Sequence, residues 1–239
     1  MEEKMSGIVL GGVNFSENDK ILNVFTLEKG VVSAKIKGVK KAGAKLKFAS
    51  EPFCFAEYIF STTLDRRTVI GASLIDSFYP LREDVKKYYA GAVVLEFIKH
   101  FYRESMVDEK EFFLAVNTLK EIAYGNDTLS PLVYFLITAL ENGGYKLSLD
   151  GCFGCDCDFH GRVFFDYRIG GFFCESCFDG VGREINLITA KALKKSKNGQ
   201  LSDGDEGVIK ALKLLEYYIL NRTEERINSL NELIKICET

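Results

Sequence analysis

The chain has 239 residues, enough for two linked folding units, and 47% of them are hydrophobic. Its longest apolar runs are broken by charges and fall short of the roughly 18 residues that a membrane span needs, and its N-terminus, with two early acids, does not resemble a secretory signal. The formal net charge of -3 excludes a uniformly basic surface, so a soluble protein of the cytoplasm is expected.

The first eighty residues are predicted to form a small β-barrel. Five short segments are rich in Val and Ile and are bounded by Gly, Asn, Ser or Asp, which is typical of strands joined by turns. They span residues 7–14, 19–26, 30–38, 52–60 and 68–76. Five such strands in about 75 residues favour a small antiparallel barrel.

A basic loop is expected between the third and fourth strands. Seven lysines and no acid lie between Lys29 and Ser50, and without them the chain has 24 basic against 34 acidic residues, a net charge of -10. Such a cluster predicts a local contact with the phosphates of DNA, the alternative being a solvated loop. The candidate DNA contacts are Lys35, Lys37, Lys40, Lys41, Lys45 and Lys47, extended by Arg66 and Arg67.

Four phenylalanines lie near the lysines in the sequence. Phe15, Phe48, Phe53 and Phe55 either stack on unpaired bases or pack in the barrel core, and packing is the favoured interpretation for each.

From Pro80 onward the apolar residues recur three and four apart, which predicts helices. The expected helices span residues 84–102, 109–124, 129–141, 189–197, 205–220 and 223–236, and Thr128 is the expected cap of the third. The predicted domains are residues 1–79 for the barrel and 80–239 for the helical part. The class is therefore α+β.

Five of the seven cysteines fall between Cys152 and Cys177, inside a predicted insertion at about residues 149–180. Cys152-x2-Cys155 and Cys174-x2-Cys177, 18 residues apart, have the spacing of a four-cysteine zinc ribbon. A hairpin over residues 162–173 would bring the two pairs together. Four thiolates leave no position for water, so the zinc would be structural. Two alternatives concern single residues: Cys157 in place of Cys155 as a ligand, and His160 as a spare candidate.

Other features argue against catalysis and against DNA contact by the ribbon. No phosphate-binding Gly-x4-Gly-Lys-Ser/Thr loop is present, and neither of the two histidines lies near a plausible nucleophile. Glu17 and Asp19 are explained by hydrogen bonds within a turn. Acidic residues outnumber basic ones around the cysteines, so the zinc site is expected to stabilise the fold and not to bind the phosphates of DNA. Cys54 and Cys237 are expected to be packing residues.

The order of these features resembles the bacterial RecO family of recombination mediators. The resemblance rests on Glu17-Asn-Asp19, the lysine loop and the cysteine pairs, together with several short segments. These segments are residues 25–30, 37–41, 79–84, 143–145, 149–155 and 170–177. It covers roughly residues 5 to 235.

The resemblance implies an N-terminal barrel of the oligonucleotide-binding (OB) type whose basic loop contacts DNA, followed by a helical domain and a zinc-binding portion. It also implies a non-catalytic DNA-repair protein, acting in the cytoplasm at the nucleoid. Proteins of this family bind single- and double-stranded DNA, anneal complementary strands and, with RecR, help load RecA onto DNA coated by single-strand-binding protein. They are also expected to grip the C-terminal tail of single-strand-binding protein, for which Lys191, Lys194, Lys195 and Lys197 are possible anchors. The alternatives are an RNA-associated zinc-ribbon factor, since barrel and charge would equally suit RNA, and a zinc-dependent hydrolase.

Overall fold

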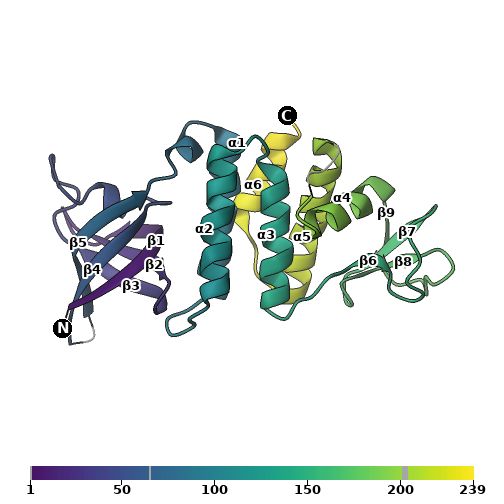
Figure 1. The fold of residues 1–239 in the computed structure, drawn as a ribbon, viewed down its shortest axis with the longest axis horizontal. Coiled ribbons are helices and arrows are strands. Elements are labelled where there is room, and N and C mark those ends of the chain that lie inside the picture. The colour runs from purple at the N-terminus through teal and green to yellow at the C-terminus, as the bar shows by residue number, and fades with distance from the viewer. Residues whose placement is uncertain (1, 65, 201–203) are drawn as a thin grey trace. The chain divides into compact units, whose positions relative to one another are not determined.

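A computed structural model describes residues 2–64, 66–200 and 204–239. The chain forms two compact units, Met1–Ala123 and Tyr124–Thr239 (Figure 1). The first unit contains the barrel and two helices, and the second contains the remaining helices and the cysteine-rich ribbon. The division at residues 79 and 80, which follows the change from strands to helices, stays a prediction.

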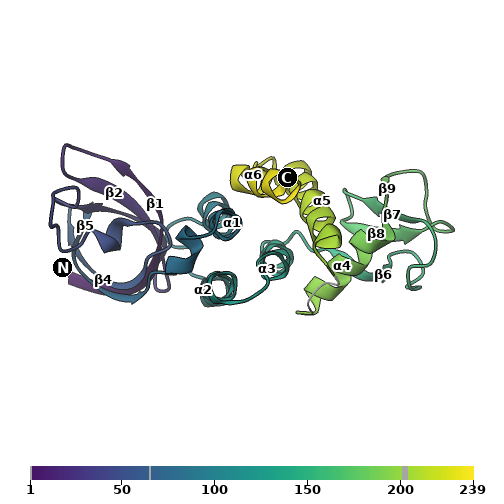
Figure 2. The same cartoon turned by 90° about the horizontal axis from the view of Figure 1, so that it is seen from above.

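The N-terminal barrel has five strands: β1 (Glu2–Asn14), β2 (Lys20–Thr26), β3 (Gly30–Ile36), β4 (Phe55–Thr63) and β5 (Arg66–Asp76). The strands close in the order β1-β2-β3-β5-β4, which confirms the predicted five-stranded barrel. Figure 2 shows the rounded outline of this barrel. The closing pair, β3 with β5, is parallel, and the other pairs are antiparallel. The expectation of a wholly antiparallel barrel was therefore wrong at this one pair.

Strand β1 begins five residues earlier than predicted. Its first half pairs with β4 from Glu2 to Ile8, and its second half pairs with β2. The opening residues Glu2, Glu3 and Lys4 are polar, so no apolar alternation marks this part as a strand. A register shift between Val9 and Gly11 lets one long strand bend across both neighbours.

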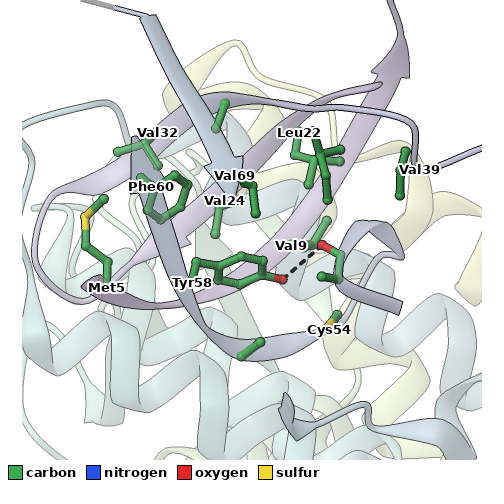
Figure 3. Close-up of a cluster of buried hydrophobic side chains, with 14 residues drawn as sticks. Met5, Val9, Leu22, Val24, Val32, Val39, Cys54, Tyr58, Phe60 and Val69 are labelled. Atoms are coloured by element: carbon green, nitrogen blue, oxygen red, sulfur yellow. Dashed lines mark hydrogen bonds between the residues drawn. The ribbon is translucent and has the colours of Figure 1, made fainter. Parts of the chain in front are cut away.

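The barrel interior is filled by aliphatic and aromatic side chains from all five strands (Figure 3). Tyr58 is fully buried, and its hydroxyl donates to the carbonyl of Ala49 at 3.2 Å. That bond satisfies the one polar atom of a large core side chain, while burial raises the pKa of the phenol. Cys54 is also buried in this core, as a packing residue.

Two helices belong to the barrel unit: α1 (Val85–Phe101) and α2 (Glu109–Tyr124), after a short turn of 3-10 helix, η2 (Tyr79–Arg82). Asp84 caps α1, because its carboxylate accepts from the backbone N–H of Lys87 at 2.9 Å. Phe25 of β2 is buried with its ring 5.6 Å from Tyr102 and 5.5 Å from Phe112. Aromatic packing thus attaches the helix pair to the barrel.

The second unit contains α3 (Leu129–Asn142), α4 (Leu187–Lys197), α5 (Asp205–Thr223) and α6 (Asn228–Cys237). Thr128 makes no capping hydrogen bond; Asp127 caps α3 instead, accepting from the N–H groups of residues 129 and 130. The predicted last helix began too early, because Thr223 ends α5 and Glu224 has a positive φ of 61°. None of the helices among the described residues is long and apolar enough to cross a membrane.

Gly30, where β3 begins after the β2–β3 turn, lies against the backbone of the segment that connects α1 and α2. A substitution there tests whether this close approach contributes to stability. Its φ is +70°, and a Cβ there would lie 2.6 Å from the carbonyl oxygens of Arg103 and Met106. Because backbone cannot move aside cheaply, we expect Gly30→Ala to lower the free energy of unfolding by about 2–4 kcal/mol in urea titrations.

Gly43→Ala is the matched control, since Gly43 has a φ of +75° but no atom within 4 Å of an added Cβ. It should cost only about 1 kcal/mol, from backbone strain alone. Equal losses in the two variants would show that the close approach at Gly30 does not matter.

Candidate nucleic-acid interface and metal centre

The lysine loop, residues 37–47, is a succession of tight turns. The backbone N–H groups of Lys41, Ala44 and Lys47 each donate to the carbonyl three residues earlier, at 3.1 to 3.2 Å. Val39 is buried, and Leu46 packs against the barrel core. These two anchors hold the loop on the barrel while its lysines face outward.

Five of the predicted contacts have their charge available. They are Lys37, Lys40, Lys41, Lys45 and Lys47. All five are exposed, and none forms an ion pair with a carboxylate in the part of the chain that the structure describes. A polyanion can therefore approach them without first breaking an internal pair.

The other three predicted contacts differ. Lys35 is half-buried, and its Nζ lies 2.8 Å from a carboxylate oxygen of Asp19. Arg67 pairs with Glu104 at 2.7 Å, beside the β2–β3 turn. Its backbone lies beside Ala34, two residues before the end of β3, while its side chain meets Glu104, which bridges to Gly30 at the start of that strand. Arg66 is exposed at the start of β5. Lys35 and Arg67 are thus held in ion pairs, and DNA contact by all eight residues stays a prediction.

Asp19 joins the β1–β2 turn, residues 15–19, to the lysine loop. Its carboxylate accepts from the backbone N–H of Gly38 at 2.8 Å as well as binding Lys35, and the N–H of Lys40 donates to the carbonyl of Asn18 at 3.1 Å. The hydrogen bonds from Lys35 and then from Gly38 lower the pKa of Asp19 to about 2. From the sequence, Asp19 was attributed to hydrogen bonds within its own turn. The hydrogen bond from Gly38, 19 residues later in the chain, was not predicted.

The structure separates the four phenylalanines by burial. Phe53 is buried, Phe55 packs against Phe112 at a centroid distance of 5.9 Å, and Phe48 rests half-buried on the barrel core. Phe15 alone of the four is exposed, at 56%. It lies in the β1–β2 turn, with the Nζ of Lys35 4.5 Å from the centre of its ring.

The cysteine-rich ribbon is a four-stranded sheet in the order β6-β8-β7-β9. The predicted hairpin is present as β7 (Val163–Asp166) and β8 (Gly171–Cys174). Two strands were missed: β6 (Ser148–Cys152), which carries the first cysteine, and β9 (Arg183–Ile185). Strand β6 runs parallel to β8, so the two cysteine pairs meet at one edge of the sheet.

The four predicted ligands lie together. The sulfur atoms of Cys152, Cys155, Cys174 and Cys177 are all within 4.8 Å of one another, and those of Cys155 and Cys174 are 3.8 Å apart. A tetrahedral ion with metal–sulfur bonds of about 2.3 Å requires sulfur separations of about 3.8 Å. The donor set therefore fits a closed, tetrahedral metal centre, and thiolates are ligands that zinc favours.

The protonation chemistry of the cluster also suits a cation. Burial opposes ionisation of Cys152, but backbone N–H groups, including that of Cys174 at 3.3 Å, lower its pKa to about 6. Hydrogen bonding of its thiol to Cys155, Cys174 and Cys152 raises the pKa of Cys177 to about 12. Adjacent thiolates repel one another, and a divalent cation would remove that repulsion.

Cys157 lies at the margin of the same cluster. Hydrogen bonding to Cys155 is the main cause that raises the pKa of this exposed thiol to about 12. Its carbonyl accepts from the N–H of Cys152 at 2.9 Å, which closes the first cysteine turn. The geometry groups Cys155 with the other three thiols, and the choice between Cys155 and Cys157 as ligand stays a prediction.

The acidic residues of the ribbon have partners on α4. Lys197 donates to Asp150, and Lys194 donates to Asp158 at 2.8 Å. These pairs fasten the ribbon to the helix, so two of the four lysines considered as anchors for a partner's tail are engaged within the chain.

Comparison with known proteins identifies the family. The model for the N-terminal part of recombination protein O matches residues 1–78, and the model for the C-terminal part matches residues 82–231. The chain belongs to the RecO family. This agrees with the predicted resemblance and with an OB-like barrel at the N-terminus.

Several similar proteins carry the name DNA repair protein RecO. One from Caldicellulosiruptor saccharolyticus is 27% identical and aligns with 97% of this chain and 98% of its own length. One from Caldicellulosiruptor bescii is 30% identical over 80% of this chain and 78% of its own. One from Acetivibrio thermocellus is 26% identical over 95% and 94%. Membership in a family of DNA repair proteins is thus established for this RecO-family chain.

Two serine substitutions test the ligand set. We expect Cys155→Ser to lose bound zinc, because a hydroxyl is a poor substitute for a thiolate, and Cys157→Ser to retain about one zinc per chain. Zinc would be measured by elemental analysis after dialysis, with thermal unfolding as a second readout, since metal binding contributes to folding of the ribbon. Loss of zinc only in Cys157→Ser would reverse the assignment.

Proposed function

We propose that this protein is a non-catalytic, DNA-binding recombination mediator. It binds single- and double-stranded DNA, anneals complementary strands and, together with RecR, helps load RecA onto DNA coated by single-strand-binding protein. The observation that carries this proposal is the set of five exposed, unpaired lysines on the loop of an OB-type barrel in a RecO-family chain. Acting on the bacterial chromosome, it would work in the cytoplasm.

The lysine loop would bind DNA through its phosphates. Each exposed ammonium that meets a phosphate releases a condensed counterion, so affinity falls as salt rises and depends little on base sequence. Binding without sequence preference is what a protein that brings any two complementary strands together requires. The anchors Val39, which is buried, and Leu46, which is partly buried, keep the five charges close to one another, which concentrates the positive potential.

The metal centre would act as structural support for this function. Zn²⁺ held by Cys152, Cys155, Cys174 and Cys177 would have four thiolate ligands and no open position for a substrate. The ion would stabilise the ribbon itself, and the pairs of Lys194 with Asp158 and of Lys197 with Asp150 would hold the ribbon against α4. We assign no catalytic residue.

The protein partners proposed are RecR, the C-terminal tail of single-strand-binding protein and, indirectly, RecA. Family membership is what supports them. Of the four lysines on α4 considered as tail anchors, Lys194 and Lys197 already bind Asp158 and Asp150. A bound tail would therefore use the other two lysines, displace these pairs or bind elsewhere in the helical part.

Replacing four loop lysines tests the interface. We expect the variant Lys37→Ala, Lys40→Ala, Lys41→Ala, Lys45→Ala to bind duplex DNA roughly tenfold or more weakly at low salt. The slope of log affinity against log salt should become shallower by about 0.9 for each phosphate that the variant no longer neutralises. Fluorescence anisotropy at several salt concentrations would measure both quantities.

The control removes four exposed lysines of other segments, Lys99, Lys110, Lys120 and Lys146, and so changes the net charge equally. It should retain most of the affinity and the slope. If both variants bind DNA equally weakly, the loop is not the interface. A matched RNA strand as competitor decides between DNA and RNA, and strand annealing on DNA coated by single-strand-binding protein tests the mediator role.

A further inference from the structure

We propose that Phe15 stacks on an unpaired base and thereby gives the lysine loop a preference for single-stranded over double-stranded DNA. This inference rests on the proposed function, because it assigns Phe15 to the same interface. The lysines recognise phosphates, which both forms of DNA present. An exposed aromatic ring recognises a base face, which only an unpaired strand offers.

The contacts of the β1–β2 turn place Phe15 beside the lysine loop. Its backbone N–H donates to the carbonyl of Asp19 at 3.0 Å, which closes the turn. Asp19 in turn binds the N–H of Gly38, the residue that opens the loop. Lys35 connects the two segments through its side chain, since its Nζ lies 2.8 Å from Asp19 and 4.5 Å from the centre of the Phe15 ring.

Packing does not account for the position of Phe15. The other three phenylalanines of this part of the sequence fill the core or rest on it, whereas Phe15 exposes 56% of its surface. One exposed apolar side chain is common on protein surfaces and needs no explanation by itself. Phe15 differs because an ammonium orients its ring and because exposed lysines without ion-pair partners follow directly at Lys37 and Lys40.

Turn and ring together match what single-strand binding requires. In OB-type barrels the connection between the first two strands is one of the loops that bind oligonucleotides. A strand lying with its phosphates along residues 37–47 would bring a base toward the β1–β2 turn. In a duplex the bases are already stacked on their neighbours, so the ring would gain nothing without opening the helix.

The experiment compares three nucleic acids of equal length: an oligo-dT strand, a strand with the same backbone but abasic positions, and a duplex. We expect Phe15→Ala to weaken binding to oligo-dT by about 5- to 150-fold, the range that corresponds to one stacked base. Affinity for the abasic strand and for the duplex should change less than about twofold, because neither offers a free base face. Phe15→Trp should bind oligo-dT at least as tightly as the original chain.

Phe15→Leu is the control for apolar contact without an aromatic face, and it should behave like Phe15→Ala. Since the side chain is exposed, all three variants should unfold at nearly the same temperature. Equal losses on oligo-dT and on the abasic strand would overturn the proposal, because they would show that Phe15 only supports the lysine loop. Unchanged binding to oligo-dT would overturn it as well.

The variant lacking four loop lysines separates this inference from the proposed function. If that variant loses affinity for all three nucleic acids while Phe15→Ala loses none, the interface stands and the stacking role falls. If the lysine variant loses none, the proposed interface itself falls.

Discussion

The parallel pairing of β3 with β5 is the constraint on which the candidate interface depends. Three residue pairs, from Ala34 with Arg67 to Ile36 with Val69, close the sheet on itself. Closure removes the edges of β3 and β5 and seals the core that holds Tyr58. Because the chain leaves β3 where this pairing ends, the next residues must turn over one end of the barrel. The lysine loop is that turn, and the core beneath it supplies its anchors.

A single carboxylate then converts two neighbouring loops into one surface. Asp19 accepts hydrogen bonds from Gly38 and Lys35 while belonging to the turn that carries Phe15. Its negative charge neutralises Lys35, so it reduces the local charge that phosphates would meet. The same bond fixes the ammonium over the Phe15 ring, where it orders an aromatic side chain that would otherwise have many rotamers. Because Lys35 occupies the carboxylate of Asp19, the exposed lysines of the loop keep their charges available for phosphates.

The sequence was sufficient where one local pattern determined the outcome. Val and Ile in short alternating runs identified the five strands, and the spacing of Cys152, Cys155, Cys174 and Cys177 identified a cluster that the structure brings together. It was insufficient where distant partners decide. Nothing near Arg67 in the sequence indicates Glu104, and the polar start of β1 becomes a strand only because β4 lies beside it. Burial of Phe53 and exposure of Phe15 follow from the barrel, since the residues are chemically identical.

Lysine-rich segments of similar composition have different surroundings in the two units. On α4, Lys194 and Lys197 meet Asp158 and Asp150 from a ribbon rich in acids, so their charge holds one part of the fold to another. No acid occurs between Lys29 and Ser50, and the acid that contacts the backbone of the lysine loop, Asp19, is satisfied by Lys35 and Gly38. A lysine already paired must exchange one anion for another, which gains little, whereas an unpaired one gains the full attraction of a phosphate. The lysine loop suits a polyanion because positive charge is locally in excess there. On α4 the neighbouring acids of the ribbon balance the lysines, whose pairs stabilise the protein instead.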